Sequence, residues 1–204
     1  MNTIMHNGYK ILIKQDSDPM NPREEFDNLG TMICFHSSYI LGDKHSYKSS
    51  DYKGWEDLKR HIIAEVGPIE TLPLYLLDHS GLTINTSGFK GVDPQGWDWG
   101  CVGFIYVSHA QAKKEYNWKQ ITKARIKFLQ ERLQAEVETY DDLLTGNVYG
   151  YVIETPDGEE ADSCWGYYGD PEKSGLVEDA KSVIEATIKH KVMTEGVQLE
   201  LALS

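Results

Sequence analysis

The sequence lacks the features of a membrane or secreted protein. None of its apolar runs approaches the roughly 18 residues of a membrane-spanning helix, so we expect no membrane partner. The first residues carry neither the basic nor the apolar part of a signal peptide, which argues against export. The 3 cysteines (Cys34, Cys101 and Cys164) form no Cys-x-x-Cys pair, which excludes a disulfide framework and a four-cysteine zinc site. We therefore expect reduced thiols and a cytoplasmic location.

Motifs that would name a reaction are also missing. The chain contains no P-loop, no Gly-x-Gly-x-x-Gly fingerprint, no His-Glu-x-x-His and no Gly-x-Ser-x-Gly. We therefore expect no cofactor and no metal, and we favour a protein that is not an enzyme. Paired-carboxylate or two-metal catalysis stays open, because such ligands are often distant in sequence.

Positive charge is nearly absent from one part of the chain. Residues 131–180 contain 14 acids but only Arg132 and Lys173 as bases, so this stretch carries the whole net charge of −12. Such a surface repels duplex nucleic acid and attracts basic protein surfaces. The alternative is a solvated face that only keeps the protein in solution. The acids that we assign to a binding face are Glu136, Glu138, Asp141, Asp142, Asp157, Glu159, Glu160 and Asp162.

Hydrophobic periodicity predicts an α+β fold built on a mainly antiparallel sheet. Helical spacing predicts four helices, over 55–66, 109–116, 119–144 and 176–190. Eight strands are expected, over 9–14, 31–36, 72–77, 82–86, 101–107, 148–155, 161–168 and 197–201. No repeat or change in composition divides the chain, so we expect a single domain over 1–204, with parts 1–70, 70–170 and 171–204.

The acidic stretch contains a predicted hairpin with an unusual aromatic and glycine pattern. A turn at Asp157-Gly158 would place Trp165 opposite Gly150 and Tyr149 opposite Gly166. Each ring would then cover a glycine, leaving open backbone where a ligand or partner can approach. The alternative is a structural aromatic–glycine pair.

Residues 78–80 read Asp-His-Ser, which suggests either a turn or a catalytic group. The turn is the favoured interpretation, with Ser80-Gly81 as the bend. In the catalytic interpretation His79 is a general base, and the enzyme centre would be His79, Asp98 and Asp162. A pocket would need Trp97, Trp99 and His36 beside His79, which the sequence alone cannot bring together.

Four segments resemble a group of uncharacterised bacteriophage and mobile-element proteins. They read PLYLLDHSG over 73–81, GWDWGCVG over 96–103, YDDLLTGNVYGY over 140–151 and DSCWGYYG over 162–169. The resemblance covers residues 70–170 and implies context, with no catalytic residues to carry over. It implies an accessory factor that disables a host defence in the host cell cytoplasm, such as an anti-CRISPR or antirestriction protein. The acidity is too confined for a full mimic of DNA.

Three functions follow as hypotheses. The first is a non-catalytic inhibitor that binds a basic surface of a host defence protein through its acidic face. The second is a nucleotide-sequestering protein in which aromatic rings stack a base. The third is a small acid–base or metal-dependent enzyme. The rings considered for stacking are Trp97, Trp99, Tyr149, Trp165 and Tyr167.

Overall fold

The structure is a computed structural model that describes residues 2–202, with side chains described through residue 194. Its contacts divide the chain into two compact units. Unit 1 joins the first 19 residues to those after Thr145, and unit 2 is Met20–Thr145. Each unit has its own four-stranded antiparallel sheet, so the expected α+β class is confirmed. The divisions between the units fall at 19/20 and 145/146.

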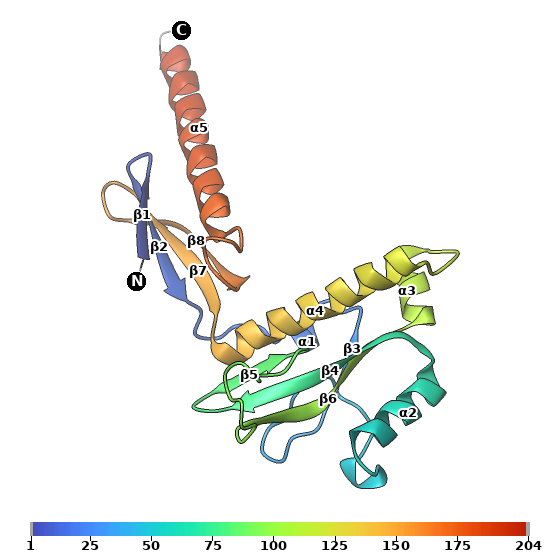
Figure 1. The fold of residues 1–204 in the computed structure, drawn as a ribbon. Helices are drawn as coiled ribbons and strands as arrows, with labels where there is room; N and C mark the ends of the chain where they lie inside the picture. The colour runs from blue at the N-terminus through green and yellow to red at the C-terminus, as the bar shows by residue number, and fades with distance from the viewer. Residues whose placement is uncertain (1, 203–204) are drawn as a thin grey trace. The chain divides into compact units, whose positions relative to one another are not determined.

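Unit 1 is a sheet covered on one face by a long helix (Figure 1). The strand order is β1-β2-β7-β8, and every neighbouring pair is antiparallel. Its elements are β1 (Asn2–His6), β2 (Tyr9–Gln15), β7 (Val148–Glu154), β8 (Glu160–Tyr168) and α5 (Leu176–Ala202). Alternate residues of β2 and β7, such as Ile11 and Ile153, are buried against Leu176 and Ile184 of the helix. This burial stabilises unit 1, at about 1.5–3 kcal/mol for each fully buried large aliphatic side chain.

One prediction for unit 1 was wrong, and one of its strands was missed. The strand expected over 197–201 does not form, because α5 continues to Ala202. Alternating Leu, Gln and Glu over five residues fits either element, and these residue types favour a helix. Strand β1 was not predicted at all. Its signal is Asn7-Gly8, where both residues have positive φ (49° and 84°), as a tight hairpin turn requires.

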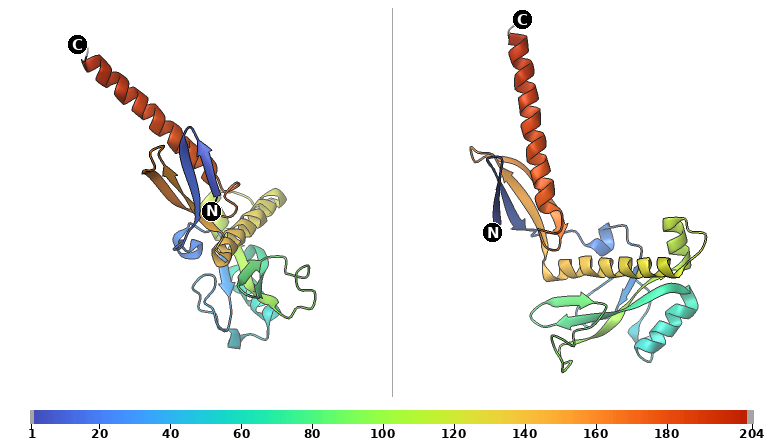
Figure 2. Two further views of the ribbon diagram at one scale, coloured as in Figure 1. Left: turned by 90° about the vertical axis from the view of Figure 1, so that its left-hand side faces the viewer. Right: turned by 45° about the horizontal axis from the view of Figure 1, so that its top comes forward.

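Unit 2 is a sheet with the strand order β3-β6-β4-β5, with helices packed on both faces. Its strands are β3 (Thr31–Cys34), β4 (Pro68–Asp78), β5 (Leu82–Asn85) and β6 (Trp99–Ser108). Its helices are α1 (Pro22–Glu25), the 3-10 turn η1 (Ser49–Asp51), α2 (Trp55–Val66), α3 (His109–Tyr116) and α4 (Lys123–Thr145). The right-hand view of Figure 2 shows α4 lying along this sheet.

The two faces of the unit 2 sheet have separate cores. Helix α4 buries Leu129, Leu133 and Val137 against one face, at the three- and four-residue steps that predicted the helix. Helix α2 buries Leu58 and Ile62 against the other face. The predicted helices of unit 2 are therefore confirmed, with α4 beginning at residue 123 instead of 119.

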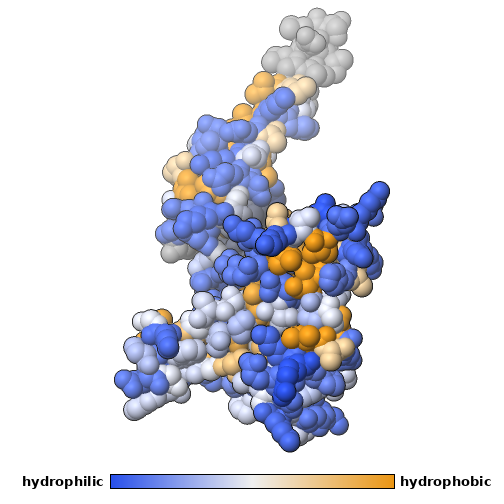
Figure 3. Space-filling view, turned by 45° about the vertical axis from the view of Figure 1, so that its right-hand side comes forward, coloured by the Kyte–Doolittle hydropathy of each residue, from blue (hydrophilic) through white to orange (hydrophobic). Residues whose placement is uncertain are grey.

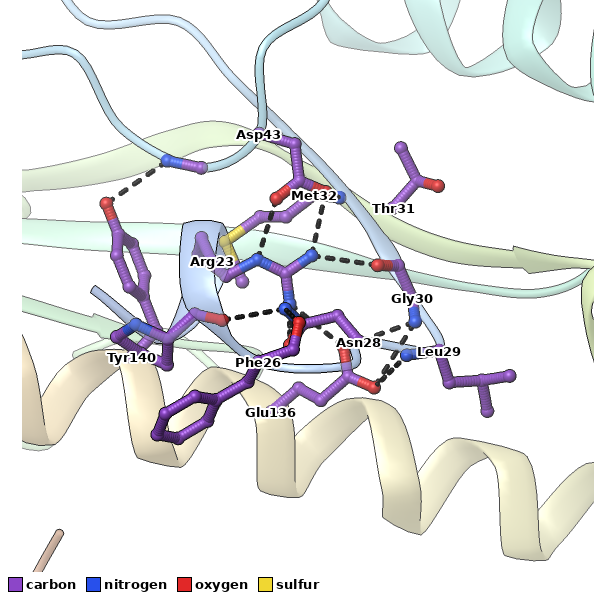
Figure 4. Close-up of polar contacts among 12 residues, drawn as sticks. Arg23, Phe26, Asn28, Leu29, Gly30, Thr31, Met32, Asp43, Glu136 and Tyr140 are labelled. Carbon is purple, nitrogen blue, oxygen red and sulfur yellow. Dashed lines mark hydrogen bonds and ion pairs between the residues drawn. The ribbon is translucent and has the colours of Figure 1, made fainter. Parts of the chain in front are cut away.

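A buried arginine joins the first segment of unit 2 to α4 and to the loop after β3 (Figure 4). The Arg23 side chain is only 1% exposed, and all of its N–H groups have acceptors. Nε and Nη2 donate to the two carboxylate oxygens of Asp43 at 2.8 and 2.7 Å. Nη1 donates to Asn28 Oδ1 and Glu136 Oε2, both at 2.9 Å, and Nη2 also donates to the Gly30 carbonyl at 2.8 Å. Burial opposes the charged guanidinium, but the two carboxylates outweigh it and raise the pKa of Arg23.

Glu136 is the second anchor of this cluster. Its Oε1 accepts the backbone N–H of Leu29 at 2.8 Å, and both of its oxygens lie 3.2 Å from the Gly30 nitrogen. The residue is 8% exposed, so its charge is used inside unit 2. Its assignment to an exposed binding face was therefore wrong.

Polar residues cover most of the face drawn in Figure 3, where apolar residues form separate patches. Within residues 2–202, no helix is long and apolar enough to cross a membrane.

Candidate functional site

The β7–β8 hairpin of unit 1 presents a long exposed strand edge. Its turn forms as predicted: the Gly158 N–H donates to the Thr155 carbonyl at 3.0 Å, and Gly158 has φ +87°. Strand β8 is the last strand of the sheet order, so its outer edge pairs with no other described strand. The first six residues of β8, from Glu160 to Trp165, are all exposed. Such an edge presents unpaired backbone N–H and C=O groups to another chain.

Trp165 covers Gly150 across the hairpin, as predicted. A Cβ added at Gly150 would lie 2.4 Å from the Trp165 ring and 2.6 Å from the Cys164 carbonyl oxygen. Tyr151 faces the α5 core, and adjacent strand residues point to opposite faces. Trp165 therefore lies on the face of the sheet away from α5, and 45% of it is exposed.

The second predicted aromatic–glycine pair does not form. A bulge between Tyr149 and Tyr151 shifts the register, so Tyr149 lies opposite Tyr167 instead of Gly166. Both tyrosines pack beside the α5 core, and the Tyr167 hydroxyl donates to Asp179 Oδ2 at 3.0 Å. Burial and hydrogen bonds with Cys164 and Asp179 raise the pKa of Tyr167. These two rings are structural, which leaves Trp165 as the exposed ring of the hairpin.

The acids of residues 131–180 divide between the two units. Those at the hairpin belong to unit 1 and are exposed: Asp157, Glu159, Glu160 and Asp162. Those on α4 belong to unit 2, where Glu138 is exposed but Asp141 is half-buried and accepts the Ile84 N–H at 2.7 Å. Burial raises the pKa of Asp141, whose ionised form is stabilised only in part by that hydrogen bond. Burial, Asp141 and Glu138 together raise the pKa of Asp142 to about 6.

The residues proposed as an enzyme centre are only partly brought together. His79 Nδ1 lies 2.8 Å from Asp98 Oδ2, so the ring N–H donates to the carboxylate. Ser80 has φ +56° and Gly81 has φ +150°, which agrees with the predicted bend. Asp162 lies in unit 1, whereas His79 and Asp98 lie in unit 2. The structure therefore shows one local contact of the proposed centre, that between His79 and Asp98.

A surface pocket of about 360 Å³ lies beside this pair in unit 2. It brings together residues that the sequence could not place side by side: His36, Leu76, Asp78, Trp97, Asp98, Trp99, Gly100 and Val102. Trp97 is 85% exposed at this pocket. The larger loop pocket formed by residues 34–49 shares His36 with it.

The loop that carries Trp97 and Asp98 is organised by one carboxylate. Asp93 accepts the backbone N–H groups of residues 95, 96, 97 and 98 at 2.7–3.1 Å. Those hydrogen bonds hold the pKa of Asp93 below its usual range. The Trp99 indole N–H donates to the Asp93 carbonyl at 2.8 Å, and its ring packs on Gly88. Sequence reasoning missed Asp93, although Asp in a Gly-rich loop is a typical turn signal.

No group of three or more His, Cys, Asp or Glu suited to a metal ion occurs among the described residues. Comparison of the chain with protein-family models, with curated proteins and with solved structures gives no match.

Proposed function

We propose that the protein is a non-catalytic inhibitor that binds a basic, extended segment of another protein along the outer edge of β8. The observation that carries the proposal is the exposed run from Glu160 to Trp165 on an edge strand. Strand addition to such an edge obtains affinity from backbone hydrogen bonds and specificity from alternate side chains.

Charge favours a basic occupant. Unit 1 has 14 acids and 6 bases, whereas unit 2 has 18 and 14. Glu160 and Asp162 are both exposed and lie on either side of a bulge in β8, where Glu160 pairs with Glu154 and Asp162 pairs with Ile153. A lysine of an added strand that lies opposite or diagonal to either acid would contribute about 0.2–1 kcal/mol.

Trp165 supplies an apolar contact at the end of the acidic run. Its ring is fixed by Gly150, so little conformational entropy is lost when a partner covers the exposed part. Tryptophan and tyrosine are enriched among residues that dominate binding energy. The resemblance to phage accessory proteins suggests a host defence protein as the partner.

The proposal is tested with a labelled peptide of alternating lysine and β-branched residues, using fluorescence anisotropy. We expect binding that weakens as salt rises from about 0.05 to 0.5 M, because the charges are exposed. The glutamate version of the peptide, and a version with alternate amides methylated, should bind at least about tenfold more weakly.

The variant Glu159→Lys, Glu160→Lys, Asp162→Lys should lose at least about tenfold in affinity and most of the salt dependence. A matched control reverses three exposed acids of unit 2, Asp27, Glu115 and Glu131, which gives the same change in net charge. The control should bind within about twofold of the parent, because it leaves every acid of the β8 edge in place. Equal binding by both triple variants, or by the methylated peptide, would refute the proposal.

A further inference from the structure

We infer that the pocket beside Trp97 in unit 2 binds a guanidinium group, as in an arginine side chain. This inference does not rest on the β8 edge, because every residue of the pocket belongs to unit 2.

The pocket forms where the end of β4 meets the start of β6. The Asp78 N–H donates to the Asp98 carbonyl at 2.9 Å, which holds the two acidic residues side by side. Leu76 lies directly opposite Gly100 in the sheet, so both residues face the same side as Asp78. Leu76 is buried, and it forms an apolar wall of the pocket with Val102.

The charge of the pocket is negative. Asp78 and Asp98 line it, and no lysine or arginine does. The Asp98 carboxylate accepts one hydrogen bond from His79, whereas the exposed Asp78 carboxylate has no side-chain partner among the described residues. His36 also lines the pocket, but its Nδ1 is already used, because it accepts the backbone N–H groups of Ser38 and Tyr39 at 3.1 and 3.3 Å. Two carboxylates with free oxygen lone pairs favour a ligand that is cationic and donates several hydrogen bonds.

Trp97 adds an aromatic surface to the two carboxylates. Asp93 holds the backbone of this loop with four accepted N–H groups, so the ring is presented from a fixed support. An exposed tryptophan face attracts cations, and a guanidinium both stacks on such a ring and forms forked hydrogen bonds with carboxylates. A lysine ammonium does only part of this, because it is compact and more strongly hydrated.

The volume agrees with a side-chain-sized ligand. At about 360 Å³ the pocket is at the small end of the roughly 300–1,000 Å³ range of small-molecule sites. It would hold a guanidinium and part of its alkyl stem, whether that group belongs to a protein or to a free small molecule.

The test is an NMR titration of the whole protein, following the Trp97 indole and backbone signals of residues 95–100. The probes are N-acetyl-arginine amide, N-acetyl-citrulline amide, N-acetyl-lysine amide and AMP. The citrulline probe is neutral but has nearly the same shape as the arginine probe. We expect the arginine probe to bind at least about fivefold more tightly than the lysine probe and about tenfold more tightly than citrulline. Equal binding of citrulline and arginine, or preference for AMP, would overturn the inference.

Gly100 allows a steric test that leaves both carboxylates in place. A Cβ at Gly100 meets no atom within 4 Å, and the residue lies on an exposed part of β6 with ordinary backbone geometry. Gly100→Val should therefore fold, with an unchanged melting temperature, but occupy the pocket and abolish binding. Undiminished binding in this variant would overturn the inference.

Substitutions in the pocket wall give the chemical test. Asp78→Asn and Trp97→Ala should each weaken arginine binding by about fivefold or more, whereas Trp97→Phe should retain part of it. Glu131→Gln, an exposed neutralisation on α4, is the control and should leave binding unchanged. If Asp78→Asn and Trp97→Ala bind as the parent does, the assignment is wrong.

A seven-residue peptide with one central arginine, compared with agmatine, identifies the source of the group. Binding of the peptide assigns a protein partner, and binding of agmatine alone assigns a small molecule. Binding of neither would overturn the inference.

Discussion

Replacement of Glu136 by alanine should destabilise unit 2 strongly. Among the described residues, the substitution leaves the buried Arg23 guanidinium with Asp43 as its remaining carboxylate partner. It also removes the acceptor of the Leu29 and Gly30 backbone N–H groups. Breaking a buried ion pair by removing one partner costs about 3–5 kcal/mol, and each buried N–H left unsatisfied costs about 1–3 kcal/mol. These costs overlap when the cavity admits water, so we expect a total loss of about 3–5 kcal/mol.

Urea unfolding followed by tryptophan fluorescence measures this loss. Trp55, Trp97, Trp99 and Trp118 lie in unit 2 and Trp165 alone lies in unit 1, so the signal reports mainly on unit 2. A typical domain has only about 5–15 kcal/mol of stability, so the midpoint should fall clearly.

The matched control is Glu138→Ala, two residues along the same helix. Glu138 is exposed, and its replacement should change the stability of unit 2 by less than about 0.5 kcal/mol. Glu136→Gln should also destabilise, because an amide keeps only one acceptor oxygen, and its N–H₂ group must then face either the Arg23 guanidinium N–H or the backbone N–H groups of Leu29 and Gly30. A loss below about 1 kcal/mol in Glu136→Ala would refute the assignment of Glu136 to an internal anchor.

Three further predictions concern single side chains. A thiol reagent should modify the exposed Cys164 first in the folded protein. Cys34 should react only on unfolding, because burial and the nearby Asp43 raise its pKa to about 12. Mass spectrometry of labelled peptides measures both reactions. Asp142→Asn should stabilise unit 2 at pH 7 but not at pH 4. The pKa of the Asp142 carboxyl is raised to about 6 in the folded protein and is about 4 in the unfolded chain, so this carboxyl disfavours folding only at a pH where it is ionised. Denaturation at both pH values tests this. Gly150→Ala should destabilise unit 1 by several kcal/mol. Adding Trp165→Ala should restore only part of the lost stability, because the clash of the new Cβ with the Cys164 carbonyl remains. A double-mutant cycle in thermal melts measures this, and additive effects of the two substitutions would contradict it.

Local patterns in the sequence identified most of the secondary structure. The stripe through Leu129 and Leu133 predicted α4, and Pro156-Asp157-Gly158 predicted the β7–β8 hairpin. Both signals act within a few residues of the chain, where periodicity and turn chemistry decide the structure. The bulge at Gly150 was not predictable in this way, because it depends on which side chains meet the core across the sheet.

Contacts between distant residues were not predictable from the sequence. Arg23 and Glu136 are 113 residues apart, and nothing near either residue indicates its partner. The sequence did suggest that His79, Trp97 and His36 could share a pocket, but only the pairing of β4 with β6 brings the segments of Asp78 and Asp98 together. Unit 1 itself is discontinuous, so a charge count along the chain mixes acids from two units.

The charge on the β8 edge also limits what can pair with it. A long exposed edge strand is a template for self-association, and natural sheets block this with charged residues. Two antiparallel copies of β8 that paired in a register centred on residue 161 would bring Glu160 and Asp162 of one copy near the same acids of the other, which is unfavourable. The same repulsion is removed when the added strand carries lysines. The acids therefore oppose a second copy and favour a basic strand, so a single feature accounts for both an unpaired edge and the chemistry of the proposed partner.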